Sequence, residues 1–275
     1  MDFPRTSIED LSVSRLLCGT NSFFGYSHFS AARDKWLQRH FTVERIAEVL
    51  TCCLDQGVNG VLSGPQPKLH EAIQIAQRRT GREMIWMCTP GSGGPVVGER
   101  LEDDIAWCAR HDVKVCMPHT SWTDPRVNRL YQRIDEWPET SACIRRHGMI
   151  PGFSTHQIET ITISDAKNYD APVYIQPYNA LGFLCAVETD WVARIIHGTS
   201  KPVIAIKPLA AGRIMPPTGL TFCFGTIKPI DMVRIGLMSV EEAQESIAIA
   251  RGLLTEGRVQ VELAVTRSKA HLVKQ

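Results

Sequence analysis

A histidine and a lysine stand where short apolar runs end, and both side chains can exchange protons. Residues 113–118 lead into His119, and residues 203–206 lead directly into Lys207. Histidine titrates near neutral pH, and a lysine that loses its hydration can serve as a base or form a Schiff base. Each also has a structural alternative, as a hydrogen-bonded strand end or as one partner of an ion pair. We expect His119 and Lys207 to be the catalytic residues.

Other polar and aromatic residues follow the ends of further apolar runs and can bind a small polar substrate. Amides and hydroxyls can hydrogen-bond a carbonyl or a hydroxyl group. Structural roles compete here too, since Cys88 can be a core thiol and His156 can open a helix. The expected substrate-binding residues are Asn21, Ser63, Cys88, Thr89, Trp122, His156, Gln176 and Asn179.

No metal site is expected. A site needs three or more converging ligands, and the spacing of the four available candidates does not require them to meet. No CxxC pair is present, which argues against structural zinc or an iron–sulfur cluster. The four candidate ligands are His28, His119, Asp124 and Glu188.

The elements that must position these residues alternate in type along the chain. Roughly 25–40 residues separate successive β-rich runs, and most intervals hold one helical pattern. Thr42 is a good N-cap, and Ser239 with Glu242 forms a capping box. Residues 21–41 are expected to form a long functional loop, residues 125–147 a helix broken near Pro138, and residues 258–272 a last helix. The eight expected strands are 15–20, 58–62, 84–89, 113–116, 149–154, 173–177, 203–206 and 232–236.

Eight such units predict an α/β fold, a (β/α)8 TIM barrel, as a single domain over residues 1–275. A doubly wound sheet would more often have five or six strands, and no G-x-G-x-x-G motif follows a strand. In a barrel, strand ends of this kind carry the chemistry.

Bulk properties narrow the function further. The net charge of +1 over 275 residues argues against nucleic-acid or membrane binding. No long apolar run and no signal peptide are present, and nine cysteines without framework spacing suggest reduced thiols. We expect a cytoplasmic protein with a small-molecule substrate. The oligomeric state is left open.

Several motifs, in this order, resemble the aldo/keto reductase superfamily over nearly the whole chain. They are VSRLLCGT at 13–20, GVNGVL at 57–62, PGFSTH at 151–156, QPYN at 176–179, KPLAAG at 207–212 and IG with SVEEA at 235–243. The STH and KPL variants look like a prokaryotic branch of that family. The resemblance implies a (β/α)8 barrel.

The resemblance also implies carbonyl reduction with a nicotinamide cofactor and a tetrad of Asp, Tyr, Lys and His. Carried over by position, the Asp falls on Leu62 and the Lys on Pro90. Residues 63–67 contain no Tyr, and only the His is kept, as His119. The tetrad is therefore degenerate.

The cofactor positions depart from the family pattern as well. Ile206 and Lys207 stand where an aromatic or polar residue usually packs on nicotinamide, and residues 237–242 offer two carboxylates and no cation. NAD(P) is therefore disfavoured, and its remaining binding residues would be Arg213 and Ser239. We expect a non-redox acid/base enzyme of the lyase or isomerase type, acting on a small polar or carbonyl-bearing molecule. The alternatives are a divergent NAD(P)-dependent oxidoreductase and a non-catalytic ligand-binding barrel.

Overall fold

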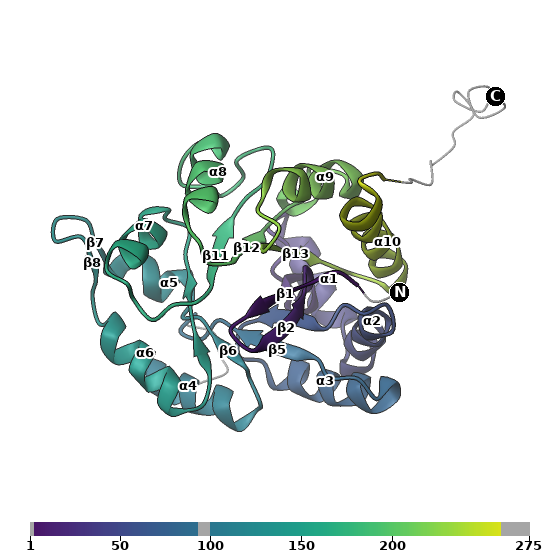
Figure 1. The fold of residues 1–275 in the computed structure, drawn as a ribbon. Helices are drawn as coiled ribbons and strands as arrows, with labels where there is room; N and C mark the ends of the chain where they lie inside the picture. Colours follow the sequence, from purple (N-terminus) through teal and green to yellow (C-terminus); the bar gives the residue numbers. More distant parts are fainter. Residues whose placement is uncertain (1–2, 93–99, 260–275) are drawn as a thin grey trace.

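A parallel barrel forms the centre of the computed structural model, which describes residues 3–92 and 100–259 (Figure 1). The sheet order is β10-β11-β12-β13-β3-β4-β5-β6-β9. Since β9 and β10 are two halves of one strand, the sheet closes on itself. This confirms the (β/α)8 prediction, with each strand within a few residues of its expected position. The barrel strands are β3 (Leu16–Gly19), β4 (Gly60–Ser63), β5 (Ile85–Cys88), β6 (Val115–Cys116), β9 (Ile150–Pro151), β10 (Phe153–Ser154), β11 (Tyr174–Pro177), β12 (Val203–Ile206) and β13 (Met232–Gly236).

Gly152 lies between β9 and β10, at a position where the structure has no room for a larger side chain. A Cβ atom at this position would lie 2.6 Å from the carbonyl oxygen of Val173 and 2.9 Å from Met117 Cγ. Gly152→Ala is therefore expected to destabilise the protein by about 1–3 kcal/mol, measured by urea unfolding. Gly225→Ala is the control, since its Cβ would meet nothing within 4 Å. Equal stability of the two variants would contradict this account.

Helices surround the barrel in Figure 1. The helix α2 (Val43–Asp55) shows why they form: Thr42 accepts a hydrogen bond from Arg45 N, and Ile46, Leu50 and Cys53 are buried at helical spacing. The helices are α1 (Ala31–His40), α2 (Val43–Asp55), α3 (Pro67–Thr80), α4 (Leu101–Arg110), α5 (Thr120–Thr123), α6 (Trp137–Arg146), α7 (Glu159–Ala166), α8 (Thr189–Gly198), α9 (Pro216–Thr226) and α10 (Val240–Glu256). Short 3-10 turns are η1 (Asn21–Phe24), η2 (Asp124–Arg126) and η3 (Ala210–Gly212).

Two expectations from the sequence were wrong. Residues 21–41 are not one long loop, because Ser30 caps the helix α1. Only Leu37 of that helix is buried, so the apolar pattern gave no signal. Residues 127–134 are not helical either, and form the hairpin β7 (Val127–Asn128) and β8 (Arg133–Ile134). The helix expected at 258–272 lies almost wholly outside the described residues.

An antiparallel hairpin of β1 (Arg5–Ile8) and β2 (Leu11–Ser14) lies across the barrel axis (Figure 1). Ile8 and Val13 of this hairpin belong to the same buried cluster as Leu17, Val173 and the other inward-facing strand residues. The interior is therefore a packed core rather than a channel, and the hairpin closes it at the amino-terminal ends of the strands.

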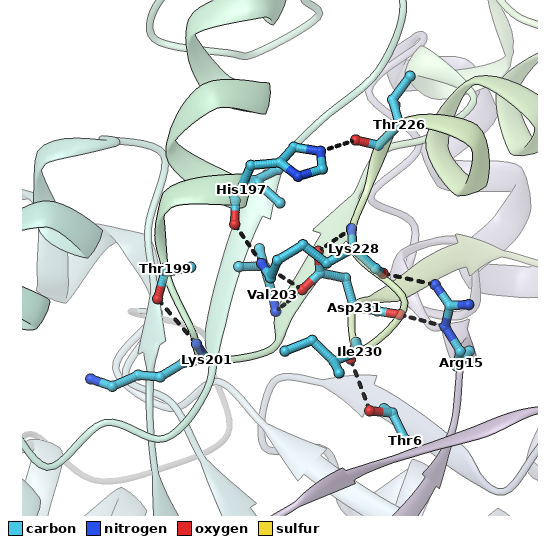
Figure 2. Close-up of polar contacts among 11 residues, drawn as sticks. Thr6, Arg15, His197, Thr199, Lys201, Val203, Thr226, Lys228, Ile230 and Asp231 are labelled. Carbon is cyan, nitrogen blue, oxygen red and sulfur yellow. Dashed lines mark hydrogen bonds and ion pairs between the residues drawn. The ribbon is translucent and has the colours of Figure 1, made fainter.

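A polar network ties the same end of the molecule together (Figure 2). The buried Asp231 carboxylate accepts hydrogen bonds from the backbone N–H groups of Val203 and Lys228, each at 2.8 Å. Arg15 donates to the backbone oxygens of Asp231 and Lys228. The network fixes the starts of β12 and β13 opposite the strand ends that carry the candidate site. Within the described residues, no helix has the length and apolarity that a bilayer span requires.

Candidate active site

Two adjoining cavities open at the carboxyl ends of the strands. Cavity 1 has a volume of about 350 Å³, and cavity 2, beside the ends of β12 and β13, about 370 Å³. Both volumes suit a small-molecule ligand. The residues that line both cavities, and so form their common wall, are Asn21, Tyr26, His28 and Lys207.

His119 lines cavity 1 just after β6. Its Nδ1 faces both the backbone N–H of Ser121, at 3.2 Å, and the Ser121 hydroxyl, at 2.7 Å. The Ser121 hydroxyl donates to Gly91 O at 3.1 Å, but the backbone N–H can only donate to Nδ1, which favours the tautomer with the proton on Nε2. Burial and the nearby charge of Lys207 lower the pKa of His119. At neutral pH the ring is therefore uncharged, with an N–H available to a ligand.

Lys207 follows β12 in a left-handed backbone conformation, with φ of 63°. A non-glycine residue in this region is strained by about 1–3 kcal/mol, and such strain concentrates at functional sites. Burial, and then the charge of Arg234, lower the pKa of Lys207 to about 8. Within the described residues its ammonium group has no hydrogen-bond or ion-pair partner. These features favour a functional lysine over the structural ion pair.

Two further histidines line cavity 1 and are held neutral. Burial, and then Lys207, lower the pKa of His156 to about 4. Burial, Lys207 and Arg234, in that order, lower the pKa of His28. Both rings can hydrogen-bond a ligand without adding charge.

Asp124 holds the two loops that carry His119 and His156. Its carboxylate accepts hydrogen bonds from the hydroxyls of Thr120 and Thr155, both at 2.5 Å, and from His156 N. In Asp124→Asn the NH₂ group of the amide would replace one acceptor oxygen and would face a hydrogen-bond donor. We therefore expect the free energy of unfolding to fall by about 1.5–3 kcal/mol. Thermal or urea unfolding measures this loss. Asp55→Asn, at an exposed position of α2, is the control, and a similarly small effect in both would refute the bracing role.

Arg234 comes from β13 and lines cavity 2. Its Nη2 donates to Asn21 Oδ1 at 2.8 Å and to Leu62 O at 3.3 Å, while its buried Nε has no partner in the part of the chain that the structure describes. Gly19 makes room for it, because a Cβ there would lie 2.7 Å from Nε. Burial lowers the pKa of Arg234 to about 10, so the guanidinium remains charged at neutral pH.

Asp104 brings a carboxylate to cavity 1 from the first turn of α4. The residue is 8% exposed, one oxygen accepts from Gly91 N at 3.0 Å, and the other has no partner among residues 3–92 and 100–259. Burial raises the pKa of Asp104, although the Gly91 N–H opposes this. A ligand hydroxyl or amine can satisfy the free oxygen.

The structure brings half of the sequence-predicted substrate-binding and catalytic residues together. The ones that line cavity 1 are Asn21, Thr89, His119, His156 and Lys207. The others line neither cavity among the described residues, because they serve the scaffold. These are Ser63, Cys88, Trp122, Gln176 and Asn179.

Their local contacts explain these scaffold roles. Ser63 accepts from the indole N–H of Trp86, and Cys88 is buried in the core. Trp122 packs beneath Arg126, and Asn179 ties its own loop through Leu181 N and Phe183 N. Gln176 is fully buried and donates to His156 O at 3.4 Å.

Sequence reasoning missed Arg234, Asp104 and Tyr26. A charged residue inside the apolar run at 232–236 was an available signal for Arg234. Asp104 resembled an ordinary acidic residue in a first helical turn, and Tyr26 lay in a region expected to be a loop. His28 was considered only as a metal ligand.

Comparisons with known proteins find no matching family model and no matching curated protein. Solved structures do match. A Pseudomonas aeruginosa protein described as an aldo-keto reductase has a TM-score of 0.66 at 16% identity, over 92% of this chain and 94% of its own. An aldo-keto reductase from Bacillus halodurans, in its holo form, has a TM-score of 0.58 at 12% identity, over 90% of each chain.

The glycerol dehydrogenase of Gluconobacter oxydans also matches, with a TM-score of 0.57 at 11% identity, over 96% of this chain and 99% of its own. The fold is that of the aldo-keto reductases. At these identities the likeness establishes the aldo-keto reductase fold and leaves the reaction to the site.

The residues present do not fit a 2′-phosphorylated nicotinamide cofactor, which the aldo-keto reductase fold would suggest. At the start of α10, the carboxylates of Glu242 and Glu245 line cavity 2 and would repel a 2′-phosphate there, whereas Lys207 and Arg234 give another part of the same cavity a positive charge. Of the two cofactor candidates, Ser239 caps α10 by accepting from Glu242 N, and Arg213 stacks on Phe183 with its guanidinium carbon 4.5 Å from the ring centre. Neither residue lines cavity 2 in the described part of the chain.

Metal ligation finds no support among the four sequence candidates. Asp124 is occupied by hydroxyl donors, and Glu188 is exposed at the start of α8. Over residues 3–92 and 100–259, no three His, Cys, Asp or Glu side chains lie close enough to hold an ion.

Proposed function

We propose that this protein is a non-redox acid/base enzyme, of the lyase or isomerase type, that acts on a small polar molecule with a carbonyl group. One observation carries the proposal: Lys207, buried and with a pKa lowered to about 8, lines the same cavity as the neutral His119. A base poised near the working pH beside a hydrogen-bond donor suits proton transfer next to a carbonyl.

The two side chains have complementary roles in this reaction. The neutral amine of Lys207 removes a proton from the carbon beside the carbonyl, and the electron pair of that bond moves onto the carbonyl oxygen. His119 Nε2–H stabilises the resulting enolate by a hydrogen bond. The lysine then returns its proton at a different carbon, or the enolate expels a leaving group from the neighbouring carbon.

Solvent-deuterium exchange tests the proposal without a known product. The protein is incubated in D₂O with a panel of small 2-oxo acids and hydroxyketones, and carbon-bound deuterium is measured by NMR. We expect incorporation into at least one compound, reduced about 10²–10⁴-fold in His119→Ala. If His119→Ala and Lys207→Ala both keep the wild-type rate, the assignment fails. Ligand binding without exchange or turnover would instead favour a non-catalytic barrel.

An oxidoreductase is the second candidate, because the solved structures of this fold are named as reductases or as a dehydrogenase. Titrating the protein into NADH and NADPH while following their fluorescence tests it. A saturable change supports cofactor binding, and no change at millimolar cofactor excludes this candidate.

The setting of the proposed enzyme follows from its thiols and its cavities. All nine cysteines are free, as expected for a protein of the reducing cytoplasm. The partner we propose is a small-molecule substrate, since the cavities are of that size.

A further inference from the structure

Two cations from neighbouring strands line cavity 2. Lys207, at the end of β12, belongs to the common wall of the cavities, and Arg234 of β13 donates to Asn21 of that wall. Both groups are positively charged, and the repulsion by Arg234 contributes to the lowered pKa of Lys207. Buried charges are normally paired, because an unpaired buried charge is costly. The two cations therefore constitute a charge excess that the fold itself does not explain.

No carboxylate of the described residues lies within ion-pair distance of either cation. Three acidic groups that line the cavities or contact their lining have other partners: Asp104 accepts from Gly91 N, Glu242 from Met238 N, and Asp34 from Ser27. Glu245 lines cavity 2 without joining either cation. None of these carboxylates therefore neutralises Lys207 or Arg234.

Arg234 is held ready for a ligand rather than left mobile. One nitrogen is fixed by Asn21 Oδ1 and Leu62 O, and Gly19 leaves the space that the guanidinium occupies. A fixed guanidinium with unused N–H groups is suited to a carboxylate or a phosphate. Lys207, at the end of the neighbouring strand, adds a second positive charge to the lining of the same cavity.

We propose that Arg234 and Lys207 form a binding site for an oxyanion group, carboxylate or phosphate, of a small ligand. The anion lies in cavity 2, and the rest of the ligand extends past Lys207 into cavity 1. If the ligand is the substrate, which rests on the proposed function, its carbonyl end reaches His119. The anion site itself does not depend on turnover.

The site makes binding dependent on pH. An anion binds protonated Lys207 more tightly than neutral Lys207, so its affinity falls as pH rises through about 8. Arg234 stays charged over this range, and the three histidines are already neutral by pH 7. The titratable and charged groups that face Lys207 or line the cavities with it are Tyr26, His28, Arg33, Asp104, His119, His156, Cys185, Arg234, Glu242 and Glu245.

Isothermal titration with inorganic phosphate and with malonate, at matched ionic strength, tests the site. The sharpest variant is Asn21→Asp, which places a carboxylate where an amide oxygen now lies 2.8 Å from Arg234 Nη2. This internal counter-ion should weaken binding at least about tenfold while keeping or raising the melting temperature. Arg234→Met should weaken it similarly, and Arg234→Lys less.

Arg194→Met is the control, because Arg194 lies on α8 over Trp191, outside both cavities, and carries the same charge. It should bind as the wild type does. Between pH 7 and 9, where malonate stays fully ionised, wild-type affinity should fall severalfold and that of Lys207→Met should not. Binding of phosphate alone assigns a phosphorylated ligand, and binding of malonate alone a carboxylate.

The proposal is overturned if neither anion binds the wild type, or if Asn21→Asp and Arg234→Met bind as tightly as Arg194→Met. These results are independent of deuterium exchange. Anion binding without exchange would remove the proposed function and keep the site, whereas exchange with unchanged anion binding in the variants would do the reverse.

Discussion

Lys207→Met is expected to slow deuterium exchange by about 10²–10⁴-fold, because it removes the proposed base. In the wild type, with an uncharged hydroxyketone as the substrate, the rate should rise about tenfold per pH unit below pH 8 and level off above it. The reason is that only neutral Lys207 can accept a proton, and its pKa is lowered to about 8. A pH series of initial exchange rates, followed by NMR, measures both effects.

Lys35→Met, on the exposed surface of α1, is the matched control for this experiment and should exchange as the wild type does. A flat pH profile, or a rate that falls between pH 6 and 8, would remove Lys207 from the role of base.

The same substitution, Lys207→Met, is expected to make the protein more stable at pH 7. Burial lowers the pKa of Lys207 from 10.5 to about 8, so at pH 7 the folded state carries a charge that costs on the order of 3 kcal/mol. Methionine keeps the apolar stem and removes the charge. Urea unfolding of the two proteins measures the gain in the free energy of unfolding.

The gain in stability of Lys207→Met is expected to depend on pH. The cost of the charged lysine is complete below about pH 8, shrinks between pH 8 and 10.5, and vanishes above 10.5, where the unfolded lysine is also neutral. The advantage of Lys207→Met should shrink over the same interval. Lys35→Met should change stability by less than about 0.5 kcal/mol at every pH, and a destabilised Lys207→Met would disprove the unpaired charge.

The barrel was predictable because its pattern is repeated. Each strand is a short apolar run followed by polar residues, and caps such as Thr42 and Ser239 mark helix starts by local hydrogen bonds. The helix α1 and the hairpin after η2 were not, because neither has a full apolar face. Their form depends on turn chemistry and on packing against distant residues.

Site residues could be predicted from the sequence only where a side chain capable of catalysis directly follows a strand. His119 and Lys207 satisfy this condition, and both line cavity 1. Cys88 satisfies it too but points into the core, because a one-residue shift along a strand reverses the side chain. Arg234 and Asp104 enter from inside a strand and from a helix, so that only the three-dimensional arrangement shows what they face.

The hairpin of β1 and β2 has a consequence for how molecules enter and leave. With the interior packed and the amino-terminal end closed, ligands can use only the mouth formed by the loops after the strands. A product must depart by the route on which the next substrate arrives. If the protein is the proposed enzyme, we therefore expect product to compete with substrate for the free protein, so that product inhibition is competitive and slows the net reaction at high conversion.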